Sequence, residues 1–371
     1  MLKVEKCLSV KGEVYGTIRF FPSRGDSMFP PKHFLILLAL LLGNVPAWGD
    51  ETLSDADYQP GKGWRIPGTG FSLGGYASAG IENDRHRHAS VGVDDFSLFV
   101  HWENDGKLRL FSELDLEKPL AWESSRGLTT HHAYLALERL YGDYLYSEKL
   151  NFRAGKFLTP IGRWNVIHAA PLVWTTSRPL ITEHTFPTNA TGAMAYGTLP
   201  VMGREIDYSV YTAIGGEWRP NPKLDPFSEA YGVHLSMPTS GLGEFGVSYA
   251  NFEQEKSSGE RKNLLGLDYF WSQNRYEVSA EMAYRFSDEG RQSDEKGLFI
   301  QGVAPISDRC YAIGRYEYYD QAGPAPGMSL WLAGLAMRLS PAMILKAEYS
   351  HATHNEIRAP EGLFASFAIL F

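Results

Sequence analysis

The chain has 371 residues, of which 44% are hydrophobic and 13% aromatic, and its formal net charge is −8. This aromatic content excludes a disordered chain, and the presence of only two Cys excludes a disulfide scaffold. The only long apolar run lies near the N-terminus, which excludes a bundle of membrane-spanning helices, since each helix needs about 20 apolar residues. The net negative charge offers no general attraction for nucleic acid, so we expect no nucleic-acid partner.

The N-terminal region has the pattern of a secretory signal peptide. Phe34–Leu42 reads FLILLALLL, a basic Lys32 precedes it, and the small-x-small sequence of residues 47–49 follows it. These three features predict cleavage before Asp50, and a run this short does not anchor a chain in a bilayer. A buried core helix is the alternative interpretation.

We therefore interpret residues 1–49 as a signal peptide and residues 50–69 as a periplasmic N-terminal segment. The residues before Met28 are unusual for a signal peptide, which predicts that Met28 is the true first residue. Cys310 is then the one Cys of the mature chain, and it cannot form an internal disulfide.

Beyond Asp50 the dominant pattern is an alternation of apolar and polar residues. In Arg275–Arg285, Tyr, Val, Ala and Met at one set of positions alternate with Arg, Glu and Ser at the other, and Leu108–Glu117 repeats the pattern. Alternation with period 2 predicts strands with one apolar and one polar face. Such strands fit either a soluble sandwich or a membrane barrel, in which lipid contacts the apolar face.

The lengths of the connections favour the barrel. Short links alternate with longer ones along the chain, as in a bacterial outer-membrane barrel with short turns at one rim and long loops at the other. Only the link Arg139–Lys149 is longer than its class predicts. We therefore predict an all-β fold over residues 70–371, a transmembrane antiparallel barrel of about 16 strands with 14–18 as the range. The predicted strands begin near Phe71, Phe96, Leu108, His132, Leu150, Gly192, Ile206, Tyr231, Phe245, Leu264, Arg275, Leu298, Cys310, Ser329, Met343 and Gly362.

The C-terminus supports the same interpretation. Apolar residues occupy every second position at the end of the chain, including Phe367, Ile369 and the terminal Phe371. This pattern resembles the C-terminal signal by which outer-membrane barrels are handed to their assembly machinery. The alternative is an ordinary edge strand. The expected partners are accordingly outer-membrane lipid and the barrel-assembly machinery.

One long link breaks the strand pattern. Residues 157–191 contain four prolines and many apolar residues, a composition that does not suit regular pairing or a solvated loop. An irregular segment this long in a compact protein is usually functional.

The sequence at the start of this link carries a resemblance. Asn151–Gly162 reads NFRAGKFLTPIG and is similar to a segment of the phosphate-selective porin O and P family, with Ile161 where an aromatic residue is expected. The resemblance implies that residues 157–191 fold into the lumen as a constriction loop and that anions such as phosphate pass. Porins of this size commonly form homotrimers, although no interface is evident in the sequence.

Charged side chains on the inward faces predict how such a lumen treats ions, because fixed wall charges replace part of the hydration of a passing ion. Arginines of the long link and of the wall would face acidic residues across the constriction. The alternative is that these charges pair with one another in a wide lumen. The candidate constriction residues are Arg163, Arg178, Arg109, Arg153, Glu113, Asp115 and Arg315.

The sequence gives little support to other chemistry. Paired histidines occur at positions 86/88, 131/132 and 351/354, but without a metal-site framework they are interpreted as solvated loop residues. No catalytic or phosphate-binding motif is present, so we expect no enzyme, no cofactor and no metal. The leading hypothesis is a porin in the outer membrane of a Gram-negative bacterium, a channel for ions and small hydrophilic solutes. The alternative is a non-conducting barrel that acts as a surface adhesin or structural protein.

Overall fold

A computed structural model describes residues 58–371, except residues 60, 105, 168, 217–224, 240, 258, 289 and 291–293. The predicted signal peptide, the predicted start at Met28 and residues 50–57 lie outside the described residues. Residues 58–371 form one compact unit.

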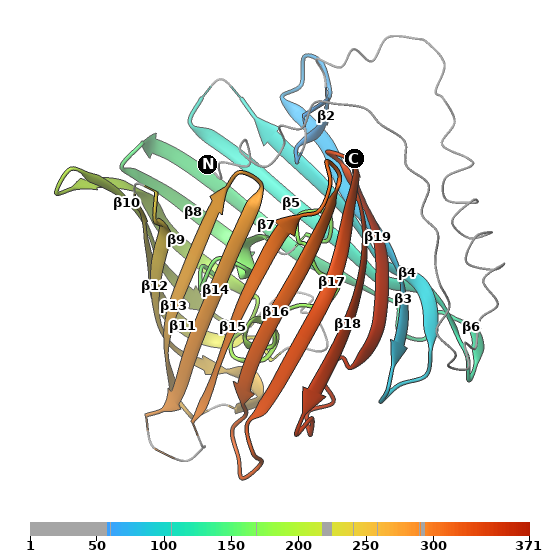
Figure 1. The fold of residues 1–371 in the computed structure, drawn as a ribbon. Helices are drawn as coiled ribbons and strands as arrows, with labels where there is room; N and C mark the ends of the chain where they lie inside the picture. The colour runs from blue at the N-terminus through green and yellow to red at the C-terminus, as the bar shows by residue number, and fades with distance from the viewer. Residues whose placement is uncertain are drawn as a thin grey trace. The chain divides into compact units, whose positions relative to one another are not determined.

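This unit is a closed antiparallel barrel of sixteen long strands, as the sequence predicts (Figure 1). Each strand pairs with its neighbours in the chain, and the last strand, β19, pairs with the first long strand, β3. Closure leaves no unpaired strand edge, which a bilayer would not tolerate. The strands are β3 (Phe71–Asp84), β4 (Ser90–Glu103), β5 (Leu108–Glu123), β7 (Tyr134–Ser147), β8 (Leu150–Leu158), β9 (Asn189–Val201), β10 (Arg204–Ile214), β11 (Phe227–Thr239), β12 (Gly243–Gln254), β13 (Lys262–Gln273), β14 (Tyr276–Ser287), β15 (Glu295–Pro305), β16 (Cys310–Asp320), β17 (Met328–Ser340), β18 (Met343–Thr353) and β19 (Gly362–Leu370).

A few short elements accompany the barrel. They are the strands β1 (Tyr58–Gln59), β2 (Gly63–Arg65) and β6 (Gly127–Thr129), the 3-10 helices η3 (Asn165–Ile167) and η4 (Glu255–Ser257), and the helix α2 (Leu180–His184). β1 pairs with β2, β2 with β3, and β6 with β5. None of the helices in the described part of the chain is long and apolar enough to cross a membrane.

The connections alternate in length as predicted, with one correction. Links of two to four residues join β4 to β5, β7 to β8 and each later pair at that rim, while the opposite rim carries the longer loops. The long link predicted at Arg139–Lys149 is wrong, because β7 continues to Ser147 and a two-residue turn follows it. The alternation that identifies a strand is broken inside β7 by an extra residue, Glu138, between the paired Leu137 and Arg139.

The outer face of the barrel is apolar. On β5, Leu108 and Leu110 are 51% and 53% exposed, whereas Glu113 on the opposite face of the same strand is fully buried at 0%. Trp331 and Leu335 of β17 are likewise 61% and 57% exposed. An apolar exterior around a polar lumen is the arrangement that places lipid outside and water inside.

The expectation that ionised residues face inward holds for only part of the wall. Phe299, Ile313, Leu330 and Leu332 face inward from β15, β16 and β17 and are each no more than 4% exposed. These apolar side chains are buried because another part of the chain covers them inside the barrel.

Candidate functional site

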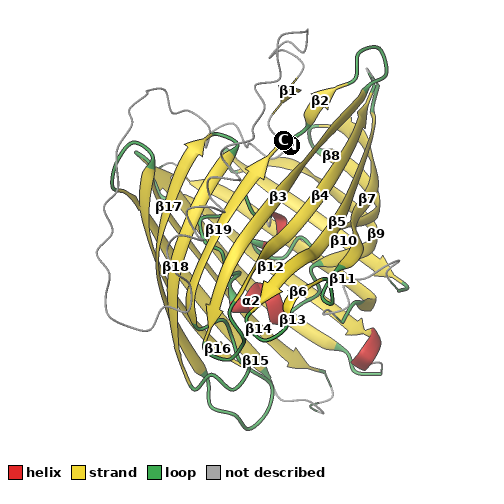
Figure 2. Cartoon of the chain, turned by 90° about the vertical axis from the view of Figure 1, so that its right-hand side faces the viewer, coloured by secondary structure: helices red, strands yellow, loops and turns green. Residues whose placement is uncertain are grey.

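The covering segment is the long connection between β8 and β9. It spans residues 159–188, since β8 continues to Leu158 and β9 begins at Asn189, and it is hereafter the inner segment. The predicted boundaries of 157–191 therefore include two residues of β8 and three of β9. Figures 1 and 2 show the inner segment, with α2, inside the ring of strands.

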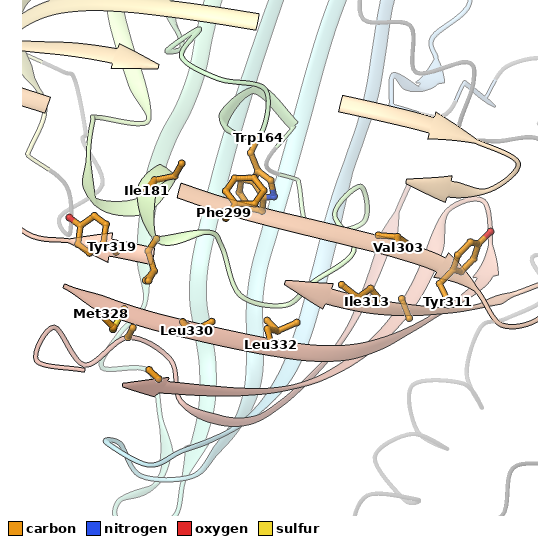
Figure 3. Packing of buried hydrophobic residues seen from close by; sticks show 14 of the residues in the cluster. Trp164, Ile181, Phe299, Val303, Tyr311, Ile313, Tyr319, Met328, Leu330 and Leu332 are labelled. Carbon is orange, nitrogen blue, oxygen red and sulfur yellow. The ribbon is translucent and has the colours of Figure 1, made fainter. Parts of the chain in front are cut away.

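Most apolar contacts of the inner segment are with one side of the wall, and Ala169 packs in a buried cluster with Tyr76 and Phe99 of the opposite side. Trp164, Leu180 and Ile181 pack in one buried cluster with Phe299 of β15 and Leu330 of β17 (Figure 3). This side, the inward face of β14–β18, is hereafter the covered wall.

A second apolar cluster fixes the two ends of the inner segment. Ile161 and Phe186 pack with Phe157 at the end of β8 and with Phe227 and Phe252 of β11 and β12. Both clusters remove large side chains from water, which is the main source of stability for such packing.

Four glutamates of the covered wall accept hydrogen bonds from the inner segment. Glu281 accepts from the backbone N–H groups of Arg163 and Trp164, at N···O distances of 2.9 and 2.6 Å. Glu348 accepts from those of Thr176 and Ser177 at 2.7 and 2.9 Å. Buried N–H groups need an acceptor, and a carboxylate is a strong one.

The other two glutamates anchor the rest of the segment. Glu317 accepts from the Leu180 backbone N–H at 2.7 Å, and Glu277 accepts from the Trp174 indole N–H at 3.1 Å. Glu277, Glu281, Glu317 and Glu348 are hereafter the latch glutamates.

Cationic side chains of the covered wall complete the attachment. Arg315, which is 2% exposed, forms an ion pair with Glu317 at 2.7 Å and donates to the Thr175 hydroxyl and the Ser177 carbonyl at 2.8 and 3.0 Å. The Lys346 ammonium donates to the carbonyls of Ala170 and Thr175, both at 3.0 Å. The wall thus supplies acceptors and donors to the segment's own backbone.

Gly162 is a position where the segment lies directly against the wall. Its φ is +63°, and an added Cβ would lie 2.3 Å from Oε2 of Glu281. Only glycine allows this φ without strain together with such a close approach.

The opposite side of the lumen, the inward face of β3, β4, β5 and β7, has a different character and is hereafter the charged wall. Its strand pairing is interrupted by β-bulges, where an extra residue is inserted into one strand. On β4 the extra residue is Asp94, so that Asp94 and Asp95 both face the lumen. On β5 the same interruption includes Lys118, whose φ is +44°, and on β7 it is Glu138.

The charged side chains of this wall form one electrostatically connected cluster with Lys156 of β8, Arg178 of the inner segment and Lys346 of β18. Lys118 pairs with Glu82 at 3.2 Å, Arg139 pairs with Glu113, and the Ser78 hydroxyl donates to Asp95 at 2.8 Å. The cluster consists of seven carboxylates and five cations: Glu82, Asp94, Asp95, Glu113, Asp115, Glu117, Glu138, Lys118, Arg139, Lys156, Arg178 and Lys346.

Arg178 is a cationic residue of the inner segment that interacts with the charged wall. Its guanidinium lies 5.1 Å from the ring centroid of Trp164 and interacts electrostatically with Asp95 and Glu138. Two of its nitrogens, Nε and Nη2, have no hydrogen-bond partner among the described residues.

The structure brings together only some of the predicted site residues. Arg178, Glu113 and Asp115 belong to the charged cluster, whereas Arg315 is engaged by the inner segment. Arg153 makes two hydrogen bonds to Asp143, at 2.7 and 2.9 Å.

The other two predicted arginines lie away from the cluster. Arg109 lies 3.6 Å from Glu103 at the short-turn rim. Arg163 lies 3.5 Å from Glu244 and stacks 3.7 Å from the ring centroid of Phe270. Asp94 and Glu138 were not among the predicted site residues, although two consecutive aspartates inside an alternating strand signal a bulge.

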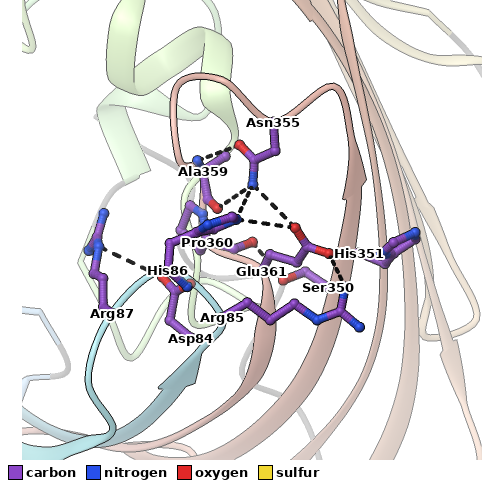
Figure 4. A network of polar contacts seen from close by, with 10 residues as sticks. All are labelled: Asp84, Arg85, His86, Arg87, Ser350, His351, Asn355, Ala359, Pro360 and Glu361. Carbon is purple, nitrogen blue, oxygen red and sulfur yellow. Dashed lines mark hydrogen bonds and ion pairs between the residues drawn. The ribbon is translucent and has the colours of Figure 1, made fainter.

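The outer end of the barrel seam carries a separate polar network (Figure 4). Glu361, just before β19, accepts from Arg85 at 2.8 Å and contacts His351 Nδ1 at 2.8 Å and His86 Nε2 at 3.3 Å. Burial alone would raise the pKa of Glu361, but hydrogen bonds from His351, Asn355 and His86 and the charge of Arg85 lower it overall. In the described part of the chain, no group of three or more His, Cys, Asp or Glu side chains is arranged to hold a metal ion.

The other end of the seam is closed by the C-terminus. Phe371 exchanges two backbone hydrogen bonds with Gly75, at 2.8 and 2.9 Å, and its ring centroid lies 6.0 Å from that of Phe96. Phe367 and Ile369 of β19 lie half-buried on the same outward face as Phe371. Their role as an assembly signal stays a prediction.

Comparisons with known sequences do not assign the chain to a family. No family model matches the chain, and an uncharacterized protein of Aquifex aeolicus is 23% identical over 345 residues, which covers 77% of each chain.

Solved porin structures are similar at low sequence identity. OmpT of Vibrio cholerae has a TM-score of 0.55 at 8% identity, covering 82% of this chain and 99% of its own. The anion-selective porin of Comamonas acidovorans has a TM-score of 0.54 at 12% identity, covering 81% and 98%. Salmonella typhi OmpF, in complex with daunomycin, has a TM-score of 0.54 at 9% identity, covering 82% and 98%. The chain is therefore a porin-like antiparallel barrel of sixteen strands.

Proposed function

We propose that the chain is a porin of the bacterial outer membrane, through which small hydrophilic solutes diffuse passively, with the inner segment as the constriction. The observation that carries the proposal is the attachment of this segment inside the barrel by the four latch glutamates. Glu281 and Glu348 lie near the middle of their strands, so the segment narrows the lumen at mid-height. A surface adhesin would have no need of an ordered segment there.

The path for solutes lies between the inner segment and the charged wall. Asp94, Asp95 and Glu117 are half-buried there, whereas the side chains under the segment are buried. Sixteen strands are enough to leave an aqueous channel in a barrel.

The arrangement gives little support to phosphate or other anions as preferred solutes. Arg153 and Arg315 are engaged with Asp143 and with the inner segment, and carboxylates outnumber cations on the charged wall. We therefore leave anion selectivity, which the resemblance implied, out of the proposed function.

Assembly and export follow from the proposal. We expect removal of residues 1–49, insertion into the outer membrane with the help of the assembly machinery, and a homotrimer. One of the similar solved structures, in-vitro folded OmpT of Vibrio cholerae, is described as a trimer form. Mass spectrometry of the exported chain and native mass measurement in detergent test these expectations.

A planar-bilayer recording of the purified mature chain tests the channel itself. Stepwise conductance that scales with salt concentration is the expected result. A folded barrel that inserts without conductance would favour the non-conducting structural role instead. Hydrolysis of lipid or peptide, abolished by a single Ser variant, would point to an enzyme.

A further inference from the structure

We propose that the charged wall binds the ammonium or guanidinium group of cationic solutes beside Asp115, and that the channel consequently prefers cations. This inference rests on the proposed function and assigns it a class of solute. It concerns the cluster on β3, β4, β5 and β7, opposite the inner segment.

The first observation is the state of Asp115. Its side chain is 6% exposed, and its Oδ1 has no hydrogen-bond partner among the described residues. The four strongest electrostatic interactions of Asp115 are all with carboxylates, namely Asp95, Glu117, Glu138 and Glu113. A buried carboxylate oxygen without a donor is costly, so this position calls for a donor from outside the chain.

The second observation is the way in which the bulges gather carboxylates around Asp115. Regular pairing would turn one of Asp94 and Asp95 away from the lumen, but the bulge in β4 turns both toward it. Asp95 and Glu117 are half-buried, so they form the accessible side of the cluster, and Asp115 is the more deeply buried member. A solute cation can therefore bind first to the accessible oxygens of Asp95 and Glu117 and then to the buried oxygens of Asp115.

The balance of charge supports the same conclusion. The charged wall itself contributes all seven carboxylates but only two cations, Lys118 and Arg139. Lys118 and Arg139 are already paired with Glu82 and Glu113, and Lys346 donates to carbonyls of the inner segment. Arg178 of the inner segment faces the carboxylates of the charged wall, which favours a solute that also carries a carboxylate or hydroxyl group at a distance from its cation.

The geometry favours an organic cation over a metal ion. The described residues contain no group of carboxylates arranged to coordinate a metal. An ammonium or guanidinium group donates hydrogen bonds in several directions and needs no convergence of ligands on one point.

Two measurements on the full mature barrel test the proposal, with 1,5-diaminopentane as the probe. In a KCl gradient the reversal potential should indicate cation preference, and Asp115→Asn should lower the cation/anion permeability ratio about twofold. Calorimetric titration of the detergent-folded barrel should show binding of the diamine that weakens about fivefold in Asp115→Asn. Glu229→Gln is the control, because Glu229 is exposed on the outward face of β11 outside the cluster, and it should change neither value.

The outcomes separate this inference from the proposed function. Anion preference, or diamine binding that Asp115→Asn leaves unchanged, would overturn the inference while the channel stands. Diamine binding without any conductance would retain the site and overturn the porin. If Asp115→Asn fails to fold, Asp94→Asn is the second variant, since the half-buried Asp94 contributes to the same cluster.

Discussion

Carboxylates lie on both sides of the lumen, but they have different partners on the two sides. On the covered wall, carboxylates such as Glu281 and Glu348 accept backbone N–H groups of the inner segment. On the charged wall, Asp115 lies among other carboxylates and has an oxygen without a donor in the described structure. An inward glutamate under the inner segment therefore fixes structure, whereas we propose that the inward carboxylates around Asp115 act on solutes.

The strands of the covered wall and of the charged wall also differ in how regularly they pair. β14, β15 and β16 pair without interruption, which gives evenly spaced positions for attaching the segment. β4, β5 and β7 contain bulges, and each bulge brings an additional charged side chain into the lumen. Bulges reorient side chains at the expense of regular pairing, and they are frequent next to functional sites.

The largest effect is expected when two latch glutamates of the covered wall are removed together. Glu281→Ala with Glu348→Ala leaves four N–H groups of the inner segment without acceptors. Each buried unsatisfied group costs about 1–3 kcal/mol, so the segment should detach and the single-channel conductance should rise about twofold or more. Planar-bilayer recording measures the change.

The control for this variant is Glu229→Ala, because the Glu229 side chain is 59% exposed and pairs with Arg261 outside the inner segment. Its conductance should equal that of the wild type. A double variant with unchanged conductance would mean that apolar packing alone holds the segment in place.

A second prediction compares burial on the two faces of one strand. Leu332 of β17 is 4% exposed on the covered wall, whereas Leu335 on the outer face is 57% exposed. Leu332→Ala should lower the free energy of unfolding by about 2–4 kcal/mol, because it leaves a cavity under the inner segment. Leu335→Ala should lower the free energy of unfolding by less, because this side chain faces the detergent or lipid. Unfolding by urea in detergent micelles measures the loss for both variants. Equal losses would show that the inner segment does not pack tightly there.

These residues also show how far the sequence predicts the structure. Alternation in Arg275–Arg285 and in Leu108–Glu117 predicts β14 and β5 correctly, because one face is apolar and the other polar. The same rule misplaces the end of β7, since the bulge at Glu138 shifts the alternation by one residue.

The sequence also does not show which inward positions belong to the covered wall and which belong to the charged wall. Phe299 and Leu332 face a lumen, yet they are apolar because a distant segment covers them. Only the three-dimensional path of the inner segment reveals which inward positions are covered. The structure places the predicted residues Glu113 and Asp115 of β5 in one cluster with Arg178 of the inner segment, and their role in a constriction stays a prediction. Arg153 and Arg315 could not be excluded from the sequence, because their partners Asp143 and Ser177 lie elsewhere in the chain.

A third prediction tests how closely the inner segment approaches the covered wall. Gly162→Ala combines an unfavourable φ with a collision against Glu281, whereas Gly203→Ala has a similar φ of +74° but open space around its Cβ. Gly203→Ala should destabilise by about 1 kcal/mol, and Gly162→Ala by about 1–2 kcal/mol more. Unfolding in urea gives both values. Equal losses would show that Glu281 moves aside without cost.

A fourth prediction concerns the seam where β19 meets β3 at the outer rim. The pKa of Glu361 is lowered below its ordinary value of 4.5, so its ionised form stabilises the folded loop. This contribution is present above pH 4.5 and is lost as the pH falls through the lowered pKa. Hydrogen exchange in residues 354–361, corrected for its intrinsic pH dependence, should therefore accelerate at pH 3 to about the rate of Glu361→Gln. Equal protection of wild type at pH 7 and pH 3 would contradict this role.

The smallest expected effect belongs to Arg163, an arginine of the inner segment whose charge interacts with Glu277 and Glu281 of the covered wall. It lies 3.5 Å from Glu244 and over the ring of Phe270, with 30% of its side chain exposed. Arg163→Glu places a second carboxylate beside Glu244 and should lower the anion/cation permeability ratio by about 1.5-fold. Arg178→Glu, which acts directly on Asp95 across the path, should lower the ratio further. If reversal potentials rank the two variants in the opposite order, the solutes pass beside β12 and β13 instead, and the charged wall is not the selective side of the channel.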